Sequence, residues 1–454
     1  MAKSKVTDTS FRFADVMHNG DAGVKLGMVL MGAGLFRHKQ KVKGIIVFLL
    51  EIAFIFYMIN TGASNLAGLP GLGESGQKEV YNEAKGIYEY TAGDNSLLIL
   101  LYGIVTLFVC AALVVLWILQ MREAYKCQLL EKEGKHVPTF KEDLKSLADG
   151  NLHITLMSLP CLGILIFNIV PLTYMISMAF TTYSKEGNHL TLFDWNGLTQ
   201  FARVLNMRGN VGRQFWHVLG WTIVWAIFAT FLNYLLGMIL AMVINRKDTH
   251  GKAFWRFCFV LSIAVPQFVS LLIMRTMLQP QGAINVLLTN AGLISSPLPF
   301  LTNKTWARAT VIIINLWVGI PYTMLQVTGI LQNIPTELYE AAKMDGANGV
   351  QIFFKITLPY MLFVTTPYLI TSFCGNINNF NVIYLLTRGG PFALDYYQAG
   401  KTDLLVTWLY KLTVDQHDYA LASTIGIFIF MIVSTLSITV YNRTSAVKKE
   451  DMFQ

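Results

Sequence analysis

Hydrophobic residues in this chain gather in long, unbroken runs. Segments such as 97–101 and 425–430 are apolar on every side, whereas a strand of a membrane barrel alternates apolar and polar side chains. A helix needs about 20 apolar residues to cross a bilayer. The pattern therefore predicts an all-α membrane protein with eight spanning helices. They are expected at roughly 44–61, 97–119, 154–180, 218–244, 254–278, 307–331, 359–386 and 421–442.

The composition agrees with a membrane protein. Hydrophobic residues make up 54% of the 454 positions and charged residues only 14%, against about 25% charged in soluble domains. Most of the 35 Lys and Arg residues lie on the side of the spans where the N-terminus begins, and basic loops stay cytoplasmic. We therefore expect a multi-pass protein of the bacterial plasma membrane with both termini in the cytosol. The net charge of +8 then reflects topology and not nucleic-acid binding.

The spacing of the spans predicts two groups of helices. The first apolar run follows more than 40 residues that contain many basic side chains and no small-residue cleavage site, so we expect it to remain attached. The expected segments are a basic cytosolic tail (1–43), two N-terminal spans (44–119) with an external loop (62–96), a cytosolic linker (120–153), a six-helix core (154–443) with a loop at 332–358, and a cytosolic C-terminal tail (444–454).

The sequence does not support a metal site, a disulfide framework or a nucleotide site. The five cysteines lie in or beside the spans without a CxxC pair, and the eight histidines have no ligand spacing. Residues 71–76 match GxGxxG but follow a membrane helix instead of a strand. No GxxxxGK[ST] occurs, so we expect no cofactor and no nucleotide site on this chain. Glu51 is the one carboxylate well inside a span, and no role is assigned to it.

The cytosolic loop between the sixth and seventh spans shows helix signals. Pro335 suits the first turn of a helix, Gly346 a left-handed residue that ends it, and Asn348 the cap of a second helix. Periodicity alone fits two interpretations about equally well: an amphipathic loop that lies on the membrane, or a loop that docks on another protein.

The full string resembles a family signature. It reads Glu-Ala-Ala from Glu340, three residues, Gly346, nine residues, then Ile-Thr-Leu-Pro ending at Pro359, and it is similar to the EAA loop of binding-protein-dependent ABC importer permeases. The resemblance implies a type I importer core whose loop is the coupling helix that docks on an ABC ATPase. The coupling residues that it implies are Glu340, Ala341, Ala342, Asp345, Gly346, Ile356, Leu358 and Pro359.

A second resemblance covers about residues 150–445. Segments 317–322, 376–380, 385–391 and 402–406 are similar to the MalF-type subunit of maltose and maltodextrin importers. This resemblance implies a sugar site near mid-membrane, a MalG-like second permease, an ATPase dimer that uses the ATP, and an extracellular sugar-binding protein. The implied site residues are Gly319, Tyr322, Ser372, Asn376 and Asn379, with Gln267 where the family has a shorter hydroxyl side chain.

Amides, hydroxyls and an aromatic face are the groups that bind a sugar. Asn376 and Asn379 are three residues apart, and we expect them to share one helix face that contacts the oligosaccharide. The alternative is that asparagines bond neighbouring helices, and this is favoured for Asn378. Gly375 and Ile263 stand where the family has aromatic residues, which predicts a wider cavity and room for longer oligosaccharides.

Two further comparisons limit the prediction. The 181–217 connection is too short for the large external domain of some MalF proteins, which suggests a binding protein tethered to the membrane. An ion-coupled secondary transporter would need carboxylates or broken helices near the midplane, and the six core helices contain no Asp or Glu in their interiors. A permease for another oligosaccharide stays open as the alternative, because the sequence does not identify the sugar.

Overall fold

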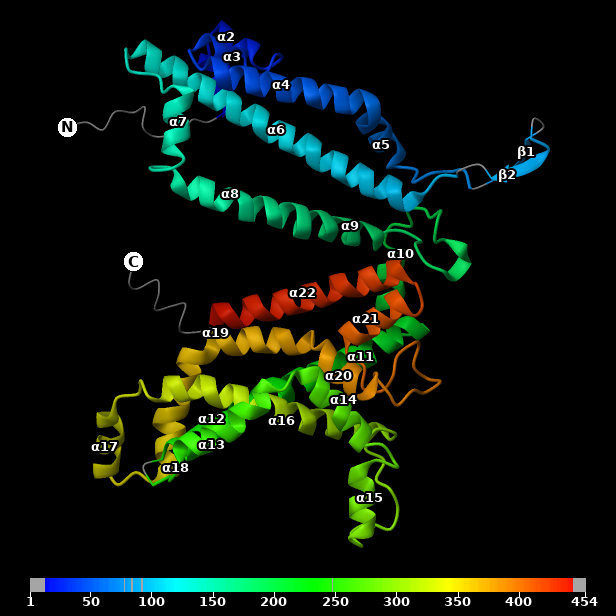
Figure 1. The fold of residues 1–454 in the computed structure, drawn as a ribbon, viewed down its shortest axis with the longest axis vertical. Coiled ribbons are helices and arrows are strands. Elements are labelled where there is room, and N and C mark those ends of the chain that lie inside the picture. The colour runs from blue at the N-terminus through cyan, green and yellow to red at the C-terminus, as the bar shows by residue number, and fades with distance from the viewer. Residues whose placement is uncertain (1–12, 77, 83–84, 91–92, 247, 444–454) are drawn as a thin grey trace. The chain divides into compact units, whose positions relative to one another are not determined.

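The computed structural model describes residues 13–76, 78–82, 85–90, 93–246 and 248–443. The prediction of an all-α membrane protein is confirmed: among these described residues, seven helices are long and apolar enough to span a membrane, and a bent pair counted as one span gives eight. The chain forms two compact units, 1–197 and 198–454 (Figure 1). The C-terminal tail expected at 444–454 and the first twelve residues of the expected N-terminal tail lie outside the described residues.

The first unit contains three spans. Two of them include a short π-helical turn within a continuous helix. The elements are α4 (Lys41–Tyr57), the π-turn Met58–Gly62 and α5 (Ala63–Gly68) in the first span; α6 (Ser96–Lys132) as the second; and α8 (Leu152–Ile164), the π-turn Leu165–Ile169 and α9 (Val170–Met178) in the third, with α7 (Phe140–Ser146) before it.

The N-terminal segment is folded, although the sequence predicted a cytosolic tail over 1–43. Its short helices are α1 (Phe13–Asn19), α2 (Ala22–Leu26) and α3 (Ala33–Arg37). Their apolar side chains bury against α4 and α6 in one cluster that includes Val24, Leu35 and Met121. The Glu51 carboxylate accepts a hydrogen bond of 2.9 Å from the backbone N–H of Met31. A carboxylate inside a span is therefore paired with this N-terminal segment.

The loop expected at 62–96 also differs from the prediction. The first span continues to Gly68, beyond the expected loop start at residue 62. The loop then forms an antiparallel hairpin of β1 (Glu79–Asn82) and β2 (Ile87–Tyr90), although no strand was expected. Its glycine-rich part, 71–76, wraps around Asp94, whose Oδ2 accepts bonds of 3.0 Å from the backbone N–H groups of Glu74 and Ser75 and from the Ser75 hydroxyl. These bonds lower the pKa of Asp94 from 3.8.

The limits of the two units differ from the expected segments. Helix α6 runs to Lys132, so the linker expected at 120–153 begins within a helix. The unit boundary falls at Gly197, so α8 and α9 group with the N-terminal spans and not with the core expected at 154–443.

The second unit carries the remaining spans and the loop expected at 332–358. Helices α12 and α16 pack closely, and α19 packs on α11 and α22. The elements are α10 (Thr199–Leu205), α11 (Asn210–Ile227), the π-turn Phe228–Leu232, α12 (Asn233–Asn245), α13 (Lys252–Ala264), α14 (Gln267–Met277), α15 (Ala283–Asn290), α16 (Lys304–Leu331), α17 (Thr336–Met344), α18 (Gly349–Ile352), the π-turn Phe353–Thr357, α19 (Leu358–Ile377), α20 (Phe380–Thr387), α21 (Leu405–Val414) and α22 (Tyr419–Arg443).

Two helices predicted as continuous are interrupted. The span expected at 254–278 bends by 87° between α13 and α14, because the residue before Pro266 takes an extended conformation (Val265, φ −79°, ψ 125°). The span expected at 359–386 breaks at Asn378 and Asn379. There the Asn379 side chain accepts a bond of 3.3 Å from the backbone N–H of Val382 and caps α20.

A buried ion pair holds the loop between α20 and α21. The Lys411 Nζ lies 2.5 Å from Asp403 Oδ2, with 9% and 0% of the side chains exposed. Asp403 also accepts bonds from the Gly400 N–H (2.6 Å) and the Thr407 hydroxyl (2.8 Å). Burial raises the pKa of Asp403 above 3.8, although Lys411 acts in the opposite direction. The loop therefore closes around a charged pair inside the protein.

Candidate functional site

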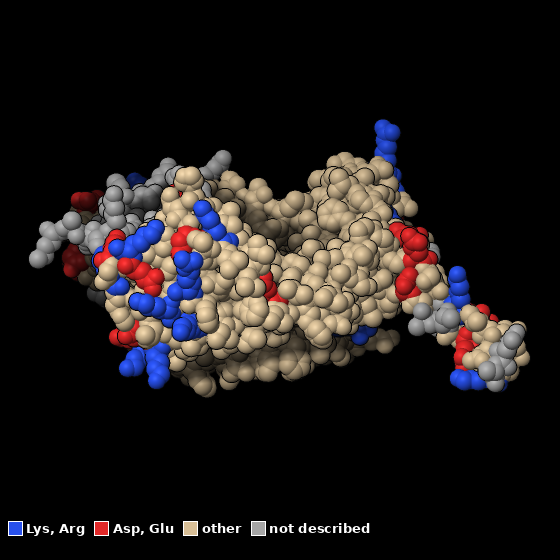
Figure 2. Space-filling model, turned by 90° about the horizontal axis from the view of Figure 1, so that it is seen from above, with Lys and Arg blue, Asp and Glu red and all other residues tan. Residues whose placement is uncertain are grey.

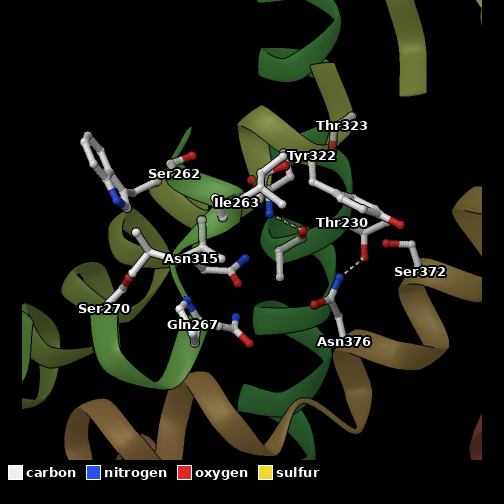
Figure 3. A pocket seen from close by; sticks show the side chains of 18 of the residues that line it. Thr230, Ser262, Ile263, Gln267, Ser270, Asn315, Tyr322, Thr323, Ser372 and Asn376 are labelled. Carbon is white, nitrogen blue, oxygen red and sulfur yellow. Dashed lines mark hydrogen bonds between the residues drawn. The ribbon is translucent and has the colours of Figure 1, made fainter. Parts of the chain in front are cut away.

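A cavity of about 520 Å³ lies among the spans of the second unit (Figure 3). Its walls come from four places: the bend between α13 and α14, the π-turn 228–232 with the start of α12, the middle of α16 and the C-terminal half of α19. A volume between 300 and 1,000 Å³ is typical of small-molecule sites. The cavity is therefore large enough to be a ligand site.

Local sequence features create this space. Pro266 turns the chain aside between α13 and α14 and brings Gln267 to the cavity wall. Helix α16 approaches α12 closely because Gly319 has no side chain: a Cβ there would lie 2.5 Å from the Asn233 amide nitrogen. Pro321 inside α16 has no N–H, so the carbonyl of Trp317 in the cavity wall receives no helical bond from it. The two prolines thus bend the chain and leave a backbone carbonyl without its helical hydrogen bond near the cavity.

The structure brings together five of the sequence-predicted sugar-site residues. Gln267, Gly319, Tyr322, Ser372 and Asn376 all line the cavity. In Figure 3 the side chains of Asn376 and Ser372 lie on one side and that of Gln267 on the opposite side.

Asn379 does not line the cavity. The expected shared helix face with Asn376 is wrong, because α19 ends at Ile377 and Asn379 caps the next helix. Asn379 instead donates a bond of 3.3 Å from its Nδ2 to the Oδ1 of Asn376. It therefore contacts a cavity residue and lies one layer behind it. Asn378 is exposed and donates to the carbonyl of Cys374 (3.4 Å).

Asn376 bonds a neighbouring helix and also lines the cavity, so it fits both interpretations that the sequence left open. Its Nδ2 donates to the Thr230 hydroxyl (3.0 Å), and its backbone carbonyl accepts a bond from the Trp225 indole (3.1 Å). An amide has two donor hydrogens and two acceptor lone pairs. One of each is used by Thr230 and Asn379, so one donor and one acceptor remain for a ligand while the side chain also links two helices.

Other polar residues of the cavity were missed by the sequence reasoning. Asn233 and Asn315 both line it and are buried. The Asn233 Nδ2 donates to the Ala229 carbonyl (2.8 Å), whereas its buried Oδ1 has no hydrogen-bond partner among the described residues. A signal was present for Asn315, which is a lone amide one helical turn before Gly319 and therefore shares its face.

The cavity is uncharged. None of its described lining residues is Asp, Glu, Lys, Arg or His. Hydroxyls, amides and the half-exposed ring of Tyr322 supply its polar and aromatic groups. Ile263 also lines it, while Gly375 does not and has nothing within 4 Å of where a Cβ would lie. These groups can bind a neutral polyhydroxyl ligand, but they offer no acid–base pair for coupling to protons.

The loop at 332–358 adopts the helix–turn–helix shape expected from its sequence. Helix α17 starts after Pro335 and is followed by Gly346 in the left-handed conformation (φ 78°). The Asn348 side chain accepts from the Gln351 N–H (2.9 Å), and the Gln351 side chain accepts from the Asn348 N–H (2.9 Å). This reciprocal pair is a capping box, which begins α18. In Figure 1 α17 lies at one edge of the unit.

Burial divides the expected coupling residues into two groups. Glu340, Ala341, Asp345, Gly346 and Pro359 are exposed, whereas Ala342, Ile356 and Leu358 are partly buried. The Tyr339 hydroxyl lies 3.2 Å from the Thr357 hydroxyl and ties the loop to the start of α19. Several apolar side chains of the loop stay exposed, among them Met344 (85%) and Phe354 (60%). An exposed apolar patch beside charged residues indicates a surface that contacts another protein or the membrane.

The sequence is similar to membrane components of transport systems over most of its length. The sequence profile described as "Binding-protein-dependent transport system inner membrane component" matches residues 233–445. The chain is 34% identical to the galactooligosaccharides transport system permease protein GanP of Bacillus subtilis (strain 168) over 93% of this chain and 97% of GanP. It is 31% identical to the maltodextrin transport system permease protein MdxF of the same organism over 93% of this chain and 96% of MdxF.

A shorter similarity extends to MalF. The maltose/maltodextrin permease MalF of Photorhabdus laumondii is 39% identical over 247 residues, which are 53% of this chain and 47% of MalF. Among solved structures, a bacterial ABC transporter that imports alginate matches with a TM-score of 0.53 and 22% identity, over 66% of this chain and 98% of the matched chain. At that identity the structural match supports the fold alone.

Proposed function

Because this chain belongs to the family of binding-protein-dependent transport system inner membrane components, we propose that it is the permease subunit of an ATP-driven oligosaccharide importer. The observation that carries the proposal is the uncharged cavity of amides and hydroxyls at the bend of α13 and α14. A sugar is neutral and has many hydroxyls, so it needs such partners when it leaves water. A protein of this family is a membrane transport component, and we infer that the chain itself catalyses no reaction.

The proposed transport mechanism is alternating access. The cavity binds one part of the sugar chain while the helix bundle opens to one side of the membrane at a time. Gln267 on one wall and Asn376 on the other would supply hydrogen bonds, and Tyr322 an aromatic face. Asn379 has a different role in this proposal from the one expected: it orients Asn376 through their 3.3 Å bond and does not contact the sugar.

Energy for the cycle would come from separate subunits. The chain contains no phosphate-binding GxxxxGK[ST] motif, so we infer that ATP is bound by an ABC ATPase dimer. The exposed residues Glu340, Ala341 and Asp345 with the apolar patch at Met344 form the surface offered to that dimer. One chain has one such loop and the dimer has two clefts, which implies a second, MalG-like permease. An extracellular binding protein would deliver the sugar.

The substrate is proposed to be a maltodextrin-type oligosaccharide. MdxF is named as a maltodextrin permease, and five of the six site residues that the MalF resemblance implies line the cavity. A galactooligosaccharide is the second candidate, because GanP covers the same share of the chain at 34% identity. The orientation with both termini in the cytosol of the plasma membrane belongs to the same proposal and rests on the distribution of Lys and Arg.

Reconstitution tests the function directly. The chain is incorporated into liposomes with its second permease, the ATPase and the binding protein, and uptake of labelled glucans of graded length is compared with uptake of galactooligosaccharides. We expect uptake that requires ATP and every subunit, with a preference for the glucans. Uptake by the chain alone, driven by an ion gradient, would contradict the importer proposal, whereas a preference for galactooligosaccharides would correct only the substrate.

The coupling surface has its own test. Glu340→Lys reverses a charge on the exposed face of α17, so we expect sugar uptake to fall while the variant still assembles. Asp248→Lys makes the same change in charge on another exposed loop of the second unit and serves as the control. If Glu340→Lys retains normal uptake and normal sugar-stimulated ATP hydrolysis, α17 is not the docking surface.

A further inference from the structure

An apolar groove of about 350 Å³ lies between the N-terminal segment and the first span. One wall is the α2–α3 segment, and the other is the first two turns of α4. Arg37 is the one charged side chain among its described lining residues; the others are apolar or glycine, and they are Leu26, Leu30, Met31, Gly32, Ala33, Phe36, Gly44, Ile45 and Phe48.

The groove is preformed because the N-terminal segment is held in place by α6. The Gln120 side chain donates to the Gly27 carbonyl (2.8 Å) and accepts from the Gly32 N–H (3.3 Å). The Trp117 indole donates to the Met28 carbonyl (3.0 Å). Gly32 has a left-handed φ of 84°, and a Cβ there would lie 2.2 Å from the Gly44 carbonyl. The segment between α2 and α3 is therefore fixed directly against the start of α4.

The outer side of this segment is strongly apolar. Val29 is 81% exposed, and Leu26, Phe36 and Ile45 are about half exposed. Such a surface is unfavourable in water. Because α4 is a membrane-spanning helix that begins at Lys41, the groove lies where the hydrocarbon of the membrane meets its polar surface. The occupant must therefore carry an apolar chain.

Cationic side chains stand at the polar end of the groove. Lys41 has its Nζ 6.0 Å from the centre of the Phe36 ring, which lines the groove. Lys41 forms no ion pair with the described residues. Arg37 contacts Asp21 (3.4 Å), but 58% of its side chain is exposed. Figure 2 shows basic and acidic side chains gathered together at one end of the view, next to a broad surface with few charged side chains. The occupant must therefore also carry a negative charge.

We infer that the groove between α2–α3 and α4 is a binding site for an anionic phospholipid. Its phosphate contacts Arg37 and Lys41, and one acyl chain lies along Ala33, Ile45 and Phe48. Basic pockets beside membrane helices bind anionic head groups through this combination of charge and apolar contact. The inference needs only that α4 spans the membrane, so it stands independently of the transported substrate.

Native mass spectrometry of the purified full-length chain tests the site. The delipidated protein is mixed with equal amounts of phosphatidylglycerol and phosphatidylcholine, and the retained lipids are counted. We expect phosphatidylglycerol to be preferred, and Lys41→Gln to reduce that preference roughly fivefold, as expected for one basic residue near an anionic lipid. Lys41 has no ion pair among the described residues, so its replacement is not expected to disturb the fold.

Two further variants separate the groove from general surface charge. Lys39→Gln removes a charge from the same segment at a side chain that is paired with Glu131 (3.8 Å) and does not line the groove, so it should retain the lipid like the wild type. Ala33→Phe fills the apolar part without changing charge and should reduce retention of phosphatidylglycerol. The inference is overturned if wild type binds both lipids equally, if Lys39→Gln acts like Lys41→Gln, or if Ala33→Phe has no effect.

Discussion

Replacement of Lys411 by methionine should destabilise the second unit more than any surface change. Lys411 is the charged partner of Asp403, whose side chain is 0% exposed. Removing one partner of a buried ion pair costs about 3–5 kcal/mol, because the other charge stays buried without compensation. Asp403 would keep its bonds from the Gly400 N–H and the Thr407 hydroxyl. We therefore expect a loss near the lower limit, about 3 kcal/mol.

A second substitution identifies the source of this loss. Asp403→Asn in the Lys411→Met background removes the buried charge, and the new amide can donate to the Thr407 hydroxyl, which rotates to accept. The double variant should recover most of the lost stability. Thermal unfolding of the purified chain measures the stability of the single and the double variant. A loss of 3 kcal/mol corresponds to roughly 6–12 °C for a unit of this size, and the double-mutant cycle gives the interaction between the two residues.

The pH dependence supplies an independent check. Burial raises the pKa of Asp403 above 3.8, so the folded protein binds this proton more readily than the unfolded chain does. With a raised pKa, the stabilising contribution of the protonated Asp403 is full below pH 3.8. It is lost as the pH rises through the folded-state pKa and is regained as the pH falls. Without Lys411 the pKa rises further. The deficit of Lys411→Met should therefore shrink as the pH falls from neutrality toward 3.8. A deficit that is independent of pH, or one far below about 3 kcal/mol at neutral pH, would refute the reasoning.

Three other predictions concern the coupling loop, the cavity and the external loop. Gly346 has a left-handed backbone conformation and open space around it. Gly346→Ala should therefore weaken sugar-stimulated ATP hydrolysis, because alanine in this conformation costs about 1–2 kcal/mol, whereas Gly346→Asn should retain the activity. Equal activities of the two variants would contradict this. Asn376→Ala should raise the KM for sugar uptake more than Asn379→Ala, because only Asn376 lines the cavity; the reverse order would exclude this assignment. The pKa of Asp94 is lowered, so the bonds that its carboxylate accepts persist above pH 3.8 and break as the pH falls through the lowered pKa. Protease cleavage of the 71–76 segment should therefore rise at that acidic pH in the wild type, and already at neutral pH in Asp94→Asn.

The spanning helices were predictable because each depends on a local run of apolar residues. One bend has a local signal, because Pro266 forces the residue before it out of the helix. The run 254–278 is nevertheless long and mostly apolar, so its pattern predicts one continuous span. Asn379 was misplaced because its side chain serves as a helix cap, a role that competes with a helical interior position. The helical period alone does not distinguish these two roles.

Features that depend on distant contacts were not predictable from the pattern. The N-terminal segment folds because Gln120 and Trp117 bond its backbone from 93 and 89 residues away, and nothing in its local composition indicates this. Asn233 reaches the cavity because it packs against Gly319 of another helix. In contrast, the turn at Gly346 and the cap at Asn348 were predicted correctly, because each depends only on adjacent residues.

The absence of charge among the described residues that line the cavity has an electrical consequence. Moving one elementary charge through a membrane potential of 100 mV involves about 2.3 kcal/mol. A neutral sugar held by amides and hydroxyls carries no charge across, and the cavity walls around it move none. The substrate-carrying step should therefore proceed at the same rate in polarised and depolarised membranes, so that a cell whose ion gradients have collapsed could still import the sugar as long as ATP remains.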